Sequence, residues 1–431
     1  MLVVETKLYG NQPQYQILDE MIRTASFVRN SCLRYWMDND KVGQYDLSRL
    51  CKELASEFEW AKKLNSMARQ ASAERAWSSI KRFYDNCKNP SVKKKGYPKF
   101  KKGRTVEYKT SGWELSQDRT AINFRDGFKA GWFKMRGGFD LNFYQLNQIK
   151  RVRIIRRADG YYCQFCVEHN KLEEIKPSGN AIGLDVGLSH FYTNSNGQKI
   201  NNPRHLRKTE KQLKRLQRQV SKKKKGSNSR KKAIKKLSRK HLKVSRQRKD
   251  WLVKLARCVV SSNDVVAYEK LSVKNMVKNH CLAKSISDAS WRTFFNWLEY
   301  YGKVMGKIVC GVNPQYTSQE CPNCKVIVKK TLSQRTHICE CGCVMDRDEA
   351  GAINILAKAL RELSRGGQSQ TSSLELVNAN GHINLYQLSE SLADKLGGAK
   401  LESRCYTLIG LTVGECQYYI LGLDETALNF I

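Results

Sequence analysis

The chain has 431 residues, with 77 Lys and Arg against 40 Asp and Glu, so its formal net charge is +37. Hydrophobic residues make up 41% and aromatic residues 10%, which is enough to bury real cores and excludes an intrinsically disordered basic tail. At ~150 residues per domain, the length predicts two or three domains. No apolar run reaches the ~18 residues of a membrane span, and the surplus of positive charge favours a polyanion, above all nucleic acid, as partner.

The N-terminal residues 1–16 are neither a basic-then-apolar signal peptide nor an Arg- and Ser-rich transit sequence. The 15 cysteines form an odd count in a chain without an export signal. We therefore expect a reducing, cytoplasmic setting, with thiols that are free or metal-bound rather than paired in disulfides.

Residues 19–88 have the apolar spacing of helices. The expected apolar faces are Met21, Ala25, Val28 and Cys32 on one helix, and Ala73, Trp77, Ile80, Tyr84 and Cys87 on another. A basic stretch follows at 93–102, where Tyr97 and Phe100 alternate with lysines. Two interpretations stay open for it: a surface that stacks bases while neutralising phosphates, or a flexible linker broken by Gly96 and Pro98.

Short alternating segments between Val106 and Val167 predict strands, in a barrel or small sheet that carries the helical block as an insert. Cys163 and Cys166 have the spacing of a metal-binding pair. Residues three apart on a strand point to opposite faces, so we expect them to be packing residues. Residues 177–180 are a candidate domain boundary.

Residues 204–250 hold 22 Lys and Arg but only the acids Glu210 and Asp250. Apolar residues at helical steps on either side of a loop-like break at 221–229 predict two basic helices joined by a turn. The expected apolar stripes are Leu206, Leu213, Leu216 and Val220 before the break, and Ala233, Leu237, His241 and Val244 after it. With so few acids to relieve self-repulsion, an anionic partner explains the charge better than a merely solvated face.

Five cysteines lie between residues 321 and 343 in otherwise polar sequence. Cys321 and Cys324 have the usual two-residue gap, whereas Cys339 and Cys341 are separated by one residue. Two such pairs on tight turns present four thiolates to one zinc ion, and Cys343 is an alternative to Cys339 or Cys341. All-cysteine ligation leaves no open position for substrate, so the expected zinc is structural.

Three carboxylates stand where a charge is costly or conspicuous. Asp185 lies in an apolar strand between glycines, Glu269 ends the apolar segment Val265–Glu269, and Asp348 lies at the start of the helix expected after Asp346. Taken singly, each is also explained as an edge or capping residue. Together, acids from two strands and a helix are suited to hold two magnesium ions ~4 Å apart, one activating water and one stabilising the leaving 3′ oxygen. In so basic a chain they favour a nuclease.

At these residues the sequence resembles the TnpB family, transposon-encoded proteins with a RuvC-type nuclease domain that are related to type V CRISPR effectors. The resemblance covers roughly residues 20–360. The matching segments are Gly183–Gly187, Tyr268–Leu271, Leu282–Trp291, Tyr316–Cys324, Asp346–Asp348 and the short basic Tyr97–Phe100. Two departures are the shortened second cysteine pair and Glu349-Ala-Gly351, where members often have a hydrophobic residue, Asn and Ala.

The resemblance implies an α/β multidomain fold: an RNase H-like (RuvC) nuclease domain with a zinc-ribbon insertion, and an N-terminal β-barrel (wedge) domain that carries an α-helical recognition insert. The implied parts are the first wedge strand (1–18), the helical insert and basic linker (19–109), the wedge barrel (110–178), the RuvC core (179–313) with the basic hairpin (204–250), the zinc ribbon (314–345), the last RuvC helix (346–362) and a C-terminal tail (363–431).

The implied activity is an RNA-guided, magnesium-dependent cut in double-stranded DNA next to a short adjacent motif, with a guide RNA from the protein's own locus. By the same resemblance Asp185, Glu269 and Asp348 are the catalytic magnesium ligands, the four cysteines bind zinc, and the protein works in a prokaryotic cytoplasm at the nucleoid. A nucleic-acid-binding regulator without cleavage, and a transposase or CRISPR effector that uses the same acids, are the alternative functions.

Overall fold

The computed structural model describes residues 2–138, 140–168, 175–331, 333–369, 377–378 and 381–382. The chain forms two compact units, residues 1–170 and 171–431, and each has a hydrophobic core of its own. Within these described ranges, no helix is long and apolar enough to cross a membrane. Most of the expected tail (363–431) lies outside the described residues, although the last long helix extends to Ser369.

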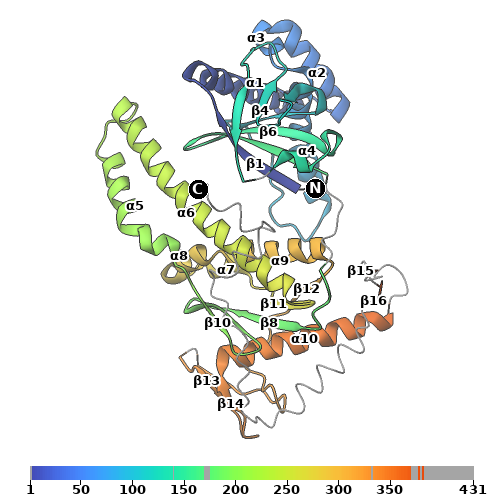
Figure 1. The fold of residues 1–431 in the computed structure, drawn as a ribbon, viewed down its shortest axis with the longest axis vertical. Coiled ribbons are helices and arrows are strands. Elements are labelled where there is room, and N and C mark those ends of the chain that lie inside the picture. The colour runs from blue at the N-terminus through green and yellow to red at the C-terminus, as the bar shows by residue number, and fades with distance from the viewer. Residues whose placement is uncertain are drawn as a thin grey trace. The chain divides into compact units, whose positions relative to one another are not determined.

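The first unit combines an antiparallel sheet with a block of helices (Figure 1). Its strands run in the order β2-β6-β7-β1-β5-β4-β3, and β1 at the centre pairs with β7 on one side and β5 on the other. The strands are β1 (Leu2–Tyr9), β2 (Thr105–Tyr108), β3 (Trp113–Leu115), β4 (Ala121–Phe124), β5 (Phe133–Arg136), β6 (Ile149–Arg157) and β7 (Gly160–Val167). The helices are α1 (Gln12–Asp38), α2 (Gln44–Glu57), α3 (Glu59–Lys62) and α4 (Ser66–Lys88), all inserted between β1 and β2.

Helix α1 begins at Gln12, earlier than the expected residue 19, because Asn11 caps it: the Asn11 side chain accepts a hydrogen bond from the Gln14 backbone at 2.9 Å. Its predicted apolar face is confirmed as buried. On α4 the prediction is right for Ala73 and Ile80 but wrong for Tyr84 and Cys87, which are exposed. At that end of the helix, the Tyr84 hydroxyl accepts a hydrogen bond from Trp36 at the rim of the helical core.

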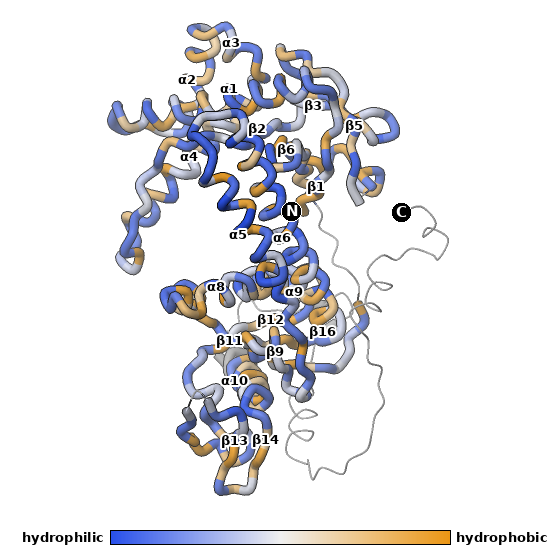
Figure 2. Tube along the Cα trace, turned by 90° about the vertical axis from the view of Figure 1, so that its left-hand side faces the viewer, coloured by the Kyte–Doolittle hydropathy of each residue, from blue (hydrophilic) through white to orange (hydrophobic). Residues whose placement is uncertain are grey.

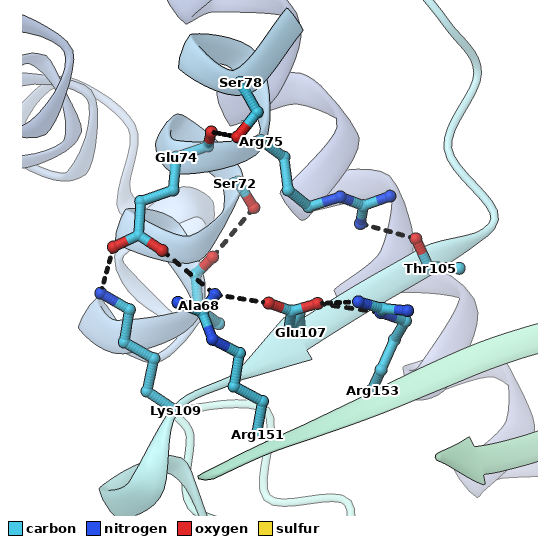
Figure 3. A network of polar contacts seen from close by, with 10 residues as sticks. All are labelled: Ala68, Ser72, Glu74, Arg75, Ser78, Thr105, Glu107, Lys109, Arg151 and Arg153. Atoms are coloured by element: carbon cyan, nitrogen blue, oxygen red, sulfur yellow. Dashed lines mark hydrogen bonds and ion pairs between the residues drawn. The ribbon is translucent and has the colours of Figure 1, made fainter. Parts of the chain in front are cut away.

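A network of ion pairs joins α4 to strands β2 and β6 (Figure 3). The Glu107 carboxylate is 4% exposed and accepts hydrogen bonds from Arg151 at 2.8 Å and from Arg153 at 2.8 Å. Burial raises the pKa of Glu107, but its hydrogen bonds and charge interactions with the two arginines lower it overall. Arg151 also reaches Glu74 of α4 at 3.1 Å. Because the buried carboxylate is fully paired, the network fixes the helical block on the sheet.

The basic stretch 93–102 is anchored on the helices of the first unit. The Tyr97 ring lies 5.5 Å from Trp36 and 5.2 Å from Phe83, between centroids. The Arg34 guanidinium stands 5.0 Å from the centre of the Phe100 ring. Both Tyr97 and Phe100 remain about half exposed. The aromatic residues therefore hold the lysines against the helical block, and the segment is more than a loose linker.

The second unit is built on a mixed sheet with the order β10-β9-β8-β11-β12. Strands β8, β9 and β10 are antiparallel neighbours, whereas β8, β11 and β12 are parallel. The strands are β8 (Ala181–Val186), β9 (His190–Asn194), β10 (Lys199–Asn201), β11 (Val265–Glu269), β12 (Ile308–Val312), the hairpin β13 (Thr336–Ile338) and β14 (Val344–Asp346), and the short pair β15 (Val377–Asn378) and β16 (Gly381–His382). The helices are α5 (His205–Ser221), α6 (Asn228–Ser261), α7 (Val273–Met276), α8 (His280–Ala289), α9 (Trp291–Met305) and α10 (Arg347–Ser369).

Helices α6 and α9 lie on one side of the mixed sheet and α10 lies on the other (Figure 1). Side chains alternate along β8 and β11, so each strand contributes residues to both layers. Ile182, Leu184 and Tyr268 pack in a core with side chains of α6 and α9. Ala267 on the other face packs against Ile355 and other apolar residues of α10. The acids Asp185 and Glu269 have the same parity as Gly183 and Ala267, so they belong to the α10 face.

The two basic helices predicted between 204 and 250 are α5 and α6, and Figure 2 shows their largely hydrophilic traces. The expected stripe is confirmed at Leu213, Val220 and Val244, which are buried, and is wrong at His241, which is exposed. Asp288 of α8 holds the base of the hairpin. Its carboxylate accepts hydrogen bonds from the Leu206 backbone at 3.1 Å and from Arg248 at 2.9 Å.

Candidate active site and metal centre

Asp185 and Glu269 lie at the same level near the carboxyl ends of two neighbouring parallel strands, β8 and β11. Leu184 is paired with Tyr268 in the register of β8 and β11, so the next residue on each strand is the acid. Side chains at matching positions of adjacent strands point to the same face, ~4.8 Å apart along the backbone. The sheet therefore presents both carboxylates together on the α10 side.

Helix α10 brings Asp348 to the same place by packing closely on β8. A Cβ atom on Gly183 would lie 2.1 Å from the Ala352 carbonyl oxygen, so only glycine allows this approach of strand and helix. One residue nearer the start of α10, a Cβ on Gly351 would lie 2.8 Å from Asp185 Oδ2. Gly351, one of the departures from the family pattern, thus leaves room for the carboxylate.

The pKa of Asp185 responds to its burial and to the nearby acids. Burial raises its pKa well above the ordinary range, and the negative charges of Glu269 and Asp348 raise it further. Burial also raises the pKa of Glu269, against the opposing influence of a hydrogen bond from Thr317 and the charge of Lys358. Carboxylates that repel one another in a half-buried site are stabilised by a bound cation.

Asp346 has a different role from Asp348. Its Oδ1 atom accepts hydrogen bonds from the backbone N–H groups of Asp348 at 2.9 Å and Glu349 at 3.3 Å, so it caps α10. Its Oδ2 atom pairs with Lys199 at 2.6 Å. The capping role considered for Asp348 therefore belongs to Asp346, and the Asp348 side chain is left for the acid cluster.

The three acids do not form one compact set of ligand atoms. Within the described ranges, the sets of three or more ligand atoms that all lie within 4.8 Å of one another are two sets of cysteine and histidine. The acids lie on neighbouring elements but are more widely spread than such a set.

The cysteine quartet is compact. One sulfur each from Cys321, Cys324, Cys339 and Cys341 lies within 4.8 Å of all the others. The Sγ atoms of Cys321 and Cys341 are 3.6 Å apart and those of Cys324 and Cys339 are 3.5 Å apart. A tetrahedral zinc ion with bonds of ~2.3 Å separates its sulfurs by ~3.8 Å. The donor set therefore fits structural zinc.

Cys343 belongs to a second set, with Cys321 and the fully buried His337. Burial raises the pKa of Cys321, but hydrogen bonds from the backbone of Cys324 and from the His337 side chain lower it to about 5. Cys321 is thus disposed to be a thiolate, the form that binds metal. The two sets share Cys321, so Cys343 lies next to the quartet.

Cys163 and Cys166 are both buried in β7. Neither belongs to a potential metal-binding group in the part of the chain that the structure describes. The expectation that they are packing residues is confirmed.

Two polar residues of this site were missed by the sequence analysis. The Thr317 hydroxyl donates to Glu269 Oε1 at 2.7 Å, and Asn354 of α10 donates to the Thr317 carbonyl at 3.0 Å. Thr317 lies in the segment Tyr316–Cys324 that resembles the TnpB family, but nothing in its residue type indicates a carboxylate partner 48 positions away.

Comparison with known proteins gives two family matches within the second unit and the strand before it. Residues 164–280 match a family described as "Probable transposase", and residues 291–355 match a family described as "Cas12f1-like, TNB domain". The first match contains Asp185 and Glu269, whereas the second contains Asp348 and the cysteine quartet.

Curated relatives cover more of the chain. A Streptomyces pristinaespiralis protein named "Putative RNA-guided DNA endonuclease" is 39% identical over 203 residues, which are 44% of this chain and 50% of the relative. Escherichia coli (strain K12) InsQ, with the same descriptive name, is 29% identical over 74% of this chain and 80% of its own length. The mimivirus TnpB-like protein L770 is 27% identical over 60% of this chain and 53% of its own. The chain is thus similar to proteins named as RNA-guided DNA endonucleases and as TnpB-like.

The fold is similar to that of a solved protein. A Cas12f1 chain, solved as a complex with sgRNA and target DNA, matches with a TM-score of 0.51 at 14% identity, over 80% of this chain and 83% of the Cas12f1 chain. At that identity the match concerns the fold alone. The chain spans about half the length of the Streptomyces relative in its alignment.

Proposed function

We propose that this protein is an RNA-guided, magnesium-dependent DNA endonuclease. The observation that carries the proposal is that Asp185, Glu269 and Asp348 approach one another near the carboxyl ends of β8 and β11. Relatives named as RNA-guided DNA endonucleases support the same activity. The cut would fall next to a short adjacent motif in double-stranded DNA, directed by an RNA from the protein's own locus, in a prokaryotic cytoplasm at the nucleoid.

The proposed architecture assigns the mixed sheet with α6, α9 and α10 to a RuvC, RNase H-like core, spanning 179–313 and 346–362. Residues 314–345 would be its zinc ribbon. The seven-stranded sheet of the first unit would be the wedge domain, with α1 to α4 as its recognition insert. The mixed parallel and antiparallel order of β8 to β12 and the compact cysteine quartet support these assignments.

In this proposal the chain's own residues supply a negatively charged, half-buried cradle. Asp185 and Glu269 come from rigid neighbouring strands, and Asp348 comes from the first turn of α10, so the three acids are held without relying on a flexible loop. Two magnesium ions bound there would activate water and stabilise the leaving 3′ oxygen.

The basic hairpin supports a nucleic-acid partner. Its base is fixed to α8 by Asp288, and its single acid on α5, Glu210, is already paired with Lys214 and Lys284. The many remaining positive charges suit phosphate contacts along an RNA–DNA duplex, where base pairing selects the sequence and the protein recognises the backbone.

A transposase that joins strands is the second candidate, favoured by the family description "Probable transposase" for residues 164–280. It would use the same three acids. Strand-transfer products, rather than simple breaks, would identify it. A regulator that binds without cutting would give neither product.

The test is a cleavage assay with the purified protein and the RNA from its own locus. Replacing Asp185, Glu269 or Asp348 with Ala should reduce cleavage by at least ~10³-fold, because each change removes several kcal/mol of charge stabilisation. RNA binding should stay within about twofold, since phosphate contacts lie elsewhere. Asp346→Ala is the matched control: loss of a helix cap costs ~1 kcal/mol of stability and a modest part of the activity. If Asp346→Ala is inactive while Asp348→Ala cuts normally, the assignment is wrong.

A further inference from the structure

Helix α10 contacts residues 313–320, which we call the clamp segment. The clamp segment connects β12 to the part of the chain that holds the cysteine quartet, which we call the cysteine module. Asn354, Lys358 and Arg361 stand at helical spacing on one face of α10. Lys358 donates to the Asn313 and Gln315 carbonyls at 3.1 and 3.3 Å. Arg361 lies 3.6 Å from the Glu320 carboxylate.

Asn354 makes the most buried of these contacts. Its side chain is 2% exposed, and its amide donates to the Thr317 carbonyl at 3.0 Å and to the Glu320 carbonyl at 2.7 Å. Buried carbonyls that lose their donor cost ~1–3 kcal/mol each. The amide therefore fixes the position of the clamp segment relative to α10.

Thr317 connects the clamp segment to the acid cluster through its hydrogen bond to Glu269. It is 5% exposed, and its hydroxyl lies 2.7 Å from Glu269 Oε1 and 3.0 Å from the Pro314 carbonyl oxygen. A hydroxyl has one proton to donate, and a carboxylate is the stronger acceptor of the two. The hydroxyl thus restricts the rotation of the Glu269 side chain about its last bonds.

We infer that Thr317 is a positioning residue for the metal site, and that Asn354 acts through it. This inference rests on the proposed function. By this arrangement α10 contributes to the site twice: directly through Asp348, and indirectly by holding the hydroxyl that orients Glu269.

The clamp segment also connects the two metal centres, because Cys321 follows Glu320 directly. The Lys330 side chain donates to the Ser318 carbonyl at 3.1 Å, so the module beyond the clamp touches it a second time. Folding of the cysteine module around zinc would therefore help to hold Thr317 against Glu269.

The experiment compares Thr317→Val, which removes the hydroxyl and keeps the shape, with Thr317→Ser, which keeps the hydroxyl. Thr336→Val makes the same chemical change on the exposed Thr336 of β13 and is the matched control. Thr317→Ala is a further variant that removes the hydroxyl without placing a methyl group against the carboxylate. Each protein, with its bound RNA, is assayed for cleavage against magnesium concentration, for Mn²⁺ binding by electron paramagnetic resonance, for zinc content and for melting temperature.

Removing an outer-shell partner of a metal ligand typically lowers metal affinity or activity ~10–100-fold. We expect Thr317→Val and Thr317→Ala to weaken Mn²⁺ binding and to raise the magnesium needed for half-maximal cleavage by about tenfold or more, with zinc content unchanged. Thr317→Ser and Thr336→Val should match the unmodified protein. Equal Mn²⁺ binding and equal magnesium dependence in folded Thr317→Val or Thr317→Ala would overturn the inference.

Failure of the proposed function has a separate signature. If the unmodified protein with its RNA cuts no DNA, the endonuclease proposal fails. The Mn²⁺ measurement still compares Thr317→Val and Thr317→Ala with the unmodified protein in that case, so the positioning role is decided either way.

Discussion

Two glycines on opposite sides of the contact between β8 and α10 should respond differently to the same substitution. In Gly183→Ala the new Cβ meets the Ala352 backbone oxygen at 2.1 Å, so strand and helix must separate by about 1.3 Å to reach ordinary contact. Overpacking of this kind costs ~3 kcal/mol, which lowers the melting temperature of a unit this size by roughly 6–12 °C.

In Gly351→Ala the new Cβ meets Asp185 Oδ2 at 2.8 Å, and a shift of about 0.6 Å of that carboxylate relieves the contact. Alanine is favoured over glycine inside a helix by ~0.5–1 kcal/mol, so the fold should be at least as stable as before. Because a displacement of ~1 Å in an active site costs ~10²-fold, we expect cleavage to fall about tenfold.

Differential scanning calorimetry and single-turnover cleavage separate the two effects. Gly351→Ala should keep its melting temperature and lose activity, whereas Gly183→Ala should lose stability. A Gly351→Ala protein that cuts at the unmodified rate would show that the space beside Asp185 is not needed, and would refute this reasoning.

Two further predictions concern the cysteine module and the first unit. Cys321→Ser should reduce bound zinc from about one ion per chain to near zero and expose the backbone of 314–345 to hydrogen exchange, since structural zinc contributes ~10 kcal/mol or more to folding in small modules. Cys281→Ser, at an exposed cysteine, is the control. Full zinc content in Cys321→Ser would refute the site. Burial raises the pKa of Asp126 to about 6, against ~3.9 in an unfolded chain. Between these pH values the Asp126 carboxyl is protonated in the folded protein but ionised in the unfolded chain. The free energy of unfolding should therefore fall by at most ~3 kcal/mol as the pH rises through pH 4 to 6. Urea unfolding at pH 4 and pH 7 checks this, and Asp126→Asn should lose that part of the pH dependence; an unchanged difference between the two pH values would contradict it.

The sequence indicated the candidate acids and the cysteine quartet because each interrupts a local pattern. Asp185 and Glu269 interrupt apolar strands, and four cysteines gather in polar sequence, so the cost of burial and the geometry of zinc already indicate metal chemistry. The basic helices were predictable from the spacing of residues such as Leu213 and Val220.

What the sequence did not reveal depends on contacts between distant segments. The Thr317 hydroxyl meets Glu269 only because β12 and α10 bring the clamp segment to the end of β11. Tyr84 continued an apolar spacing on α4, yet the core ended before it. Helical periodicity states which side chains share a face but not how far along the helix the partner extends.

In the proposed function, a bound RNA chooses the site that the acids cut. The most direct measurement changes the guide portion of the RNA that co-purifies with the protein and maps the ends of the DNA products. We expect the cut to move to the newly complementary sequence, and we expect protein stripped of RNA to cut neither site. A protein free of RNA that cuts the original sites equally well would rule out guidance by RNA and leave an unguided nuclease.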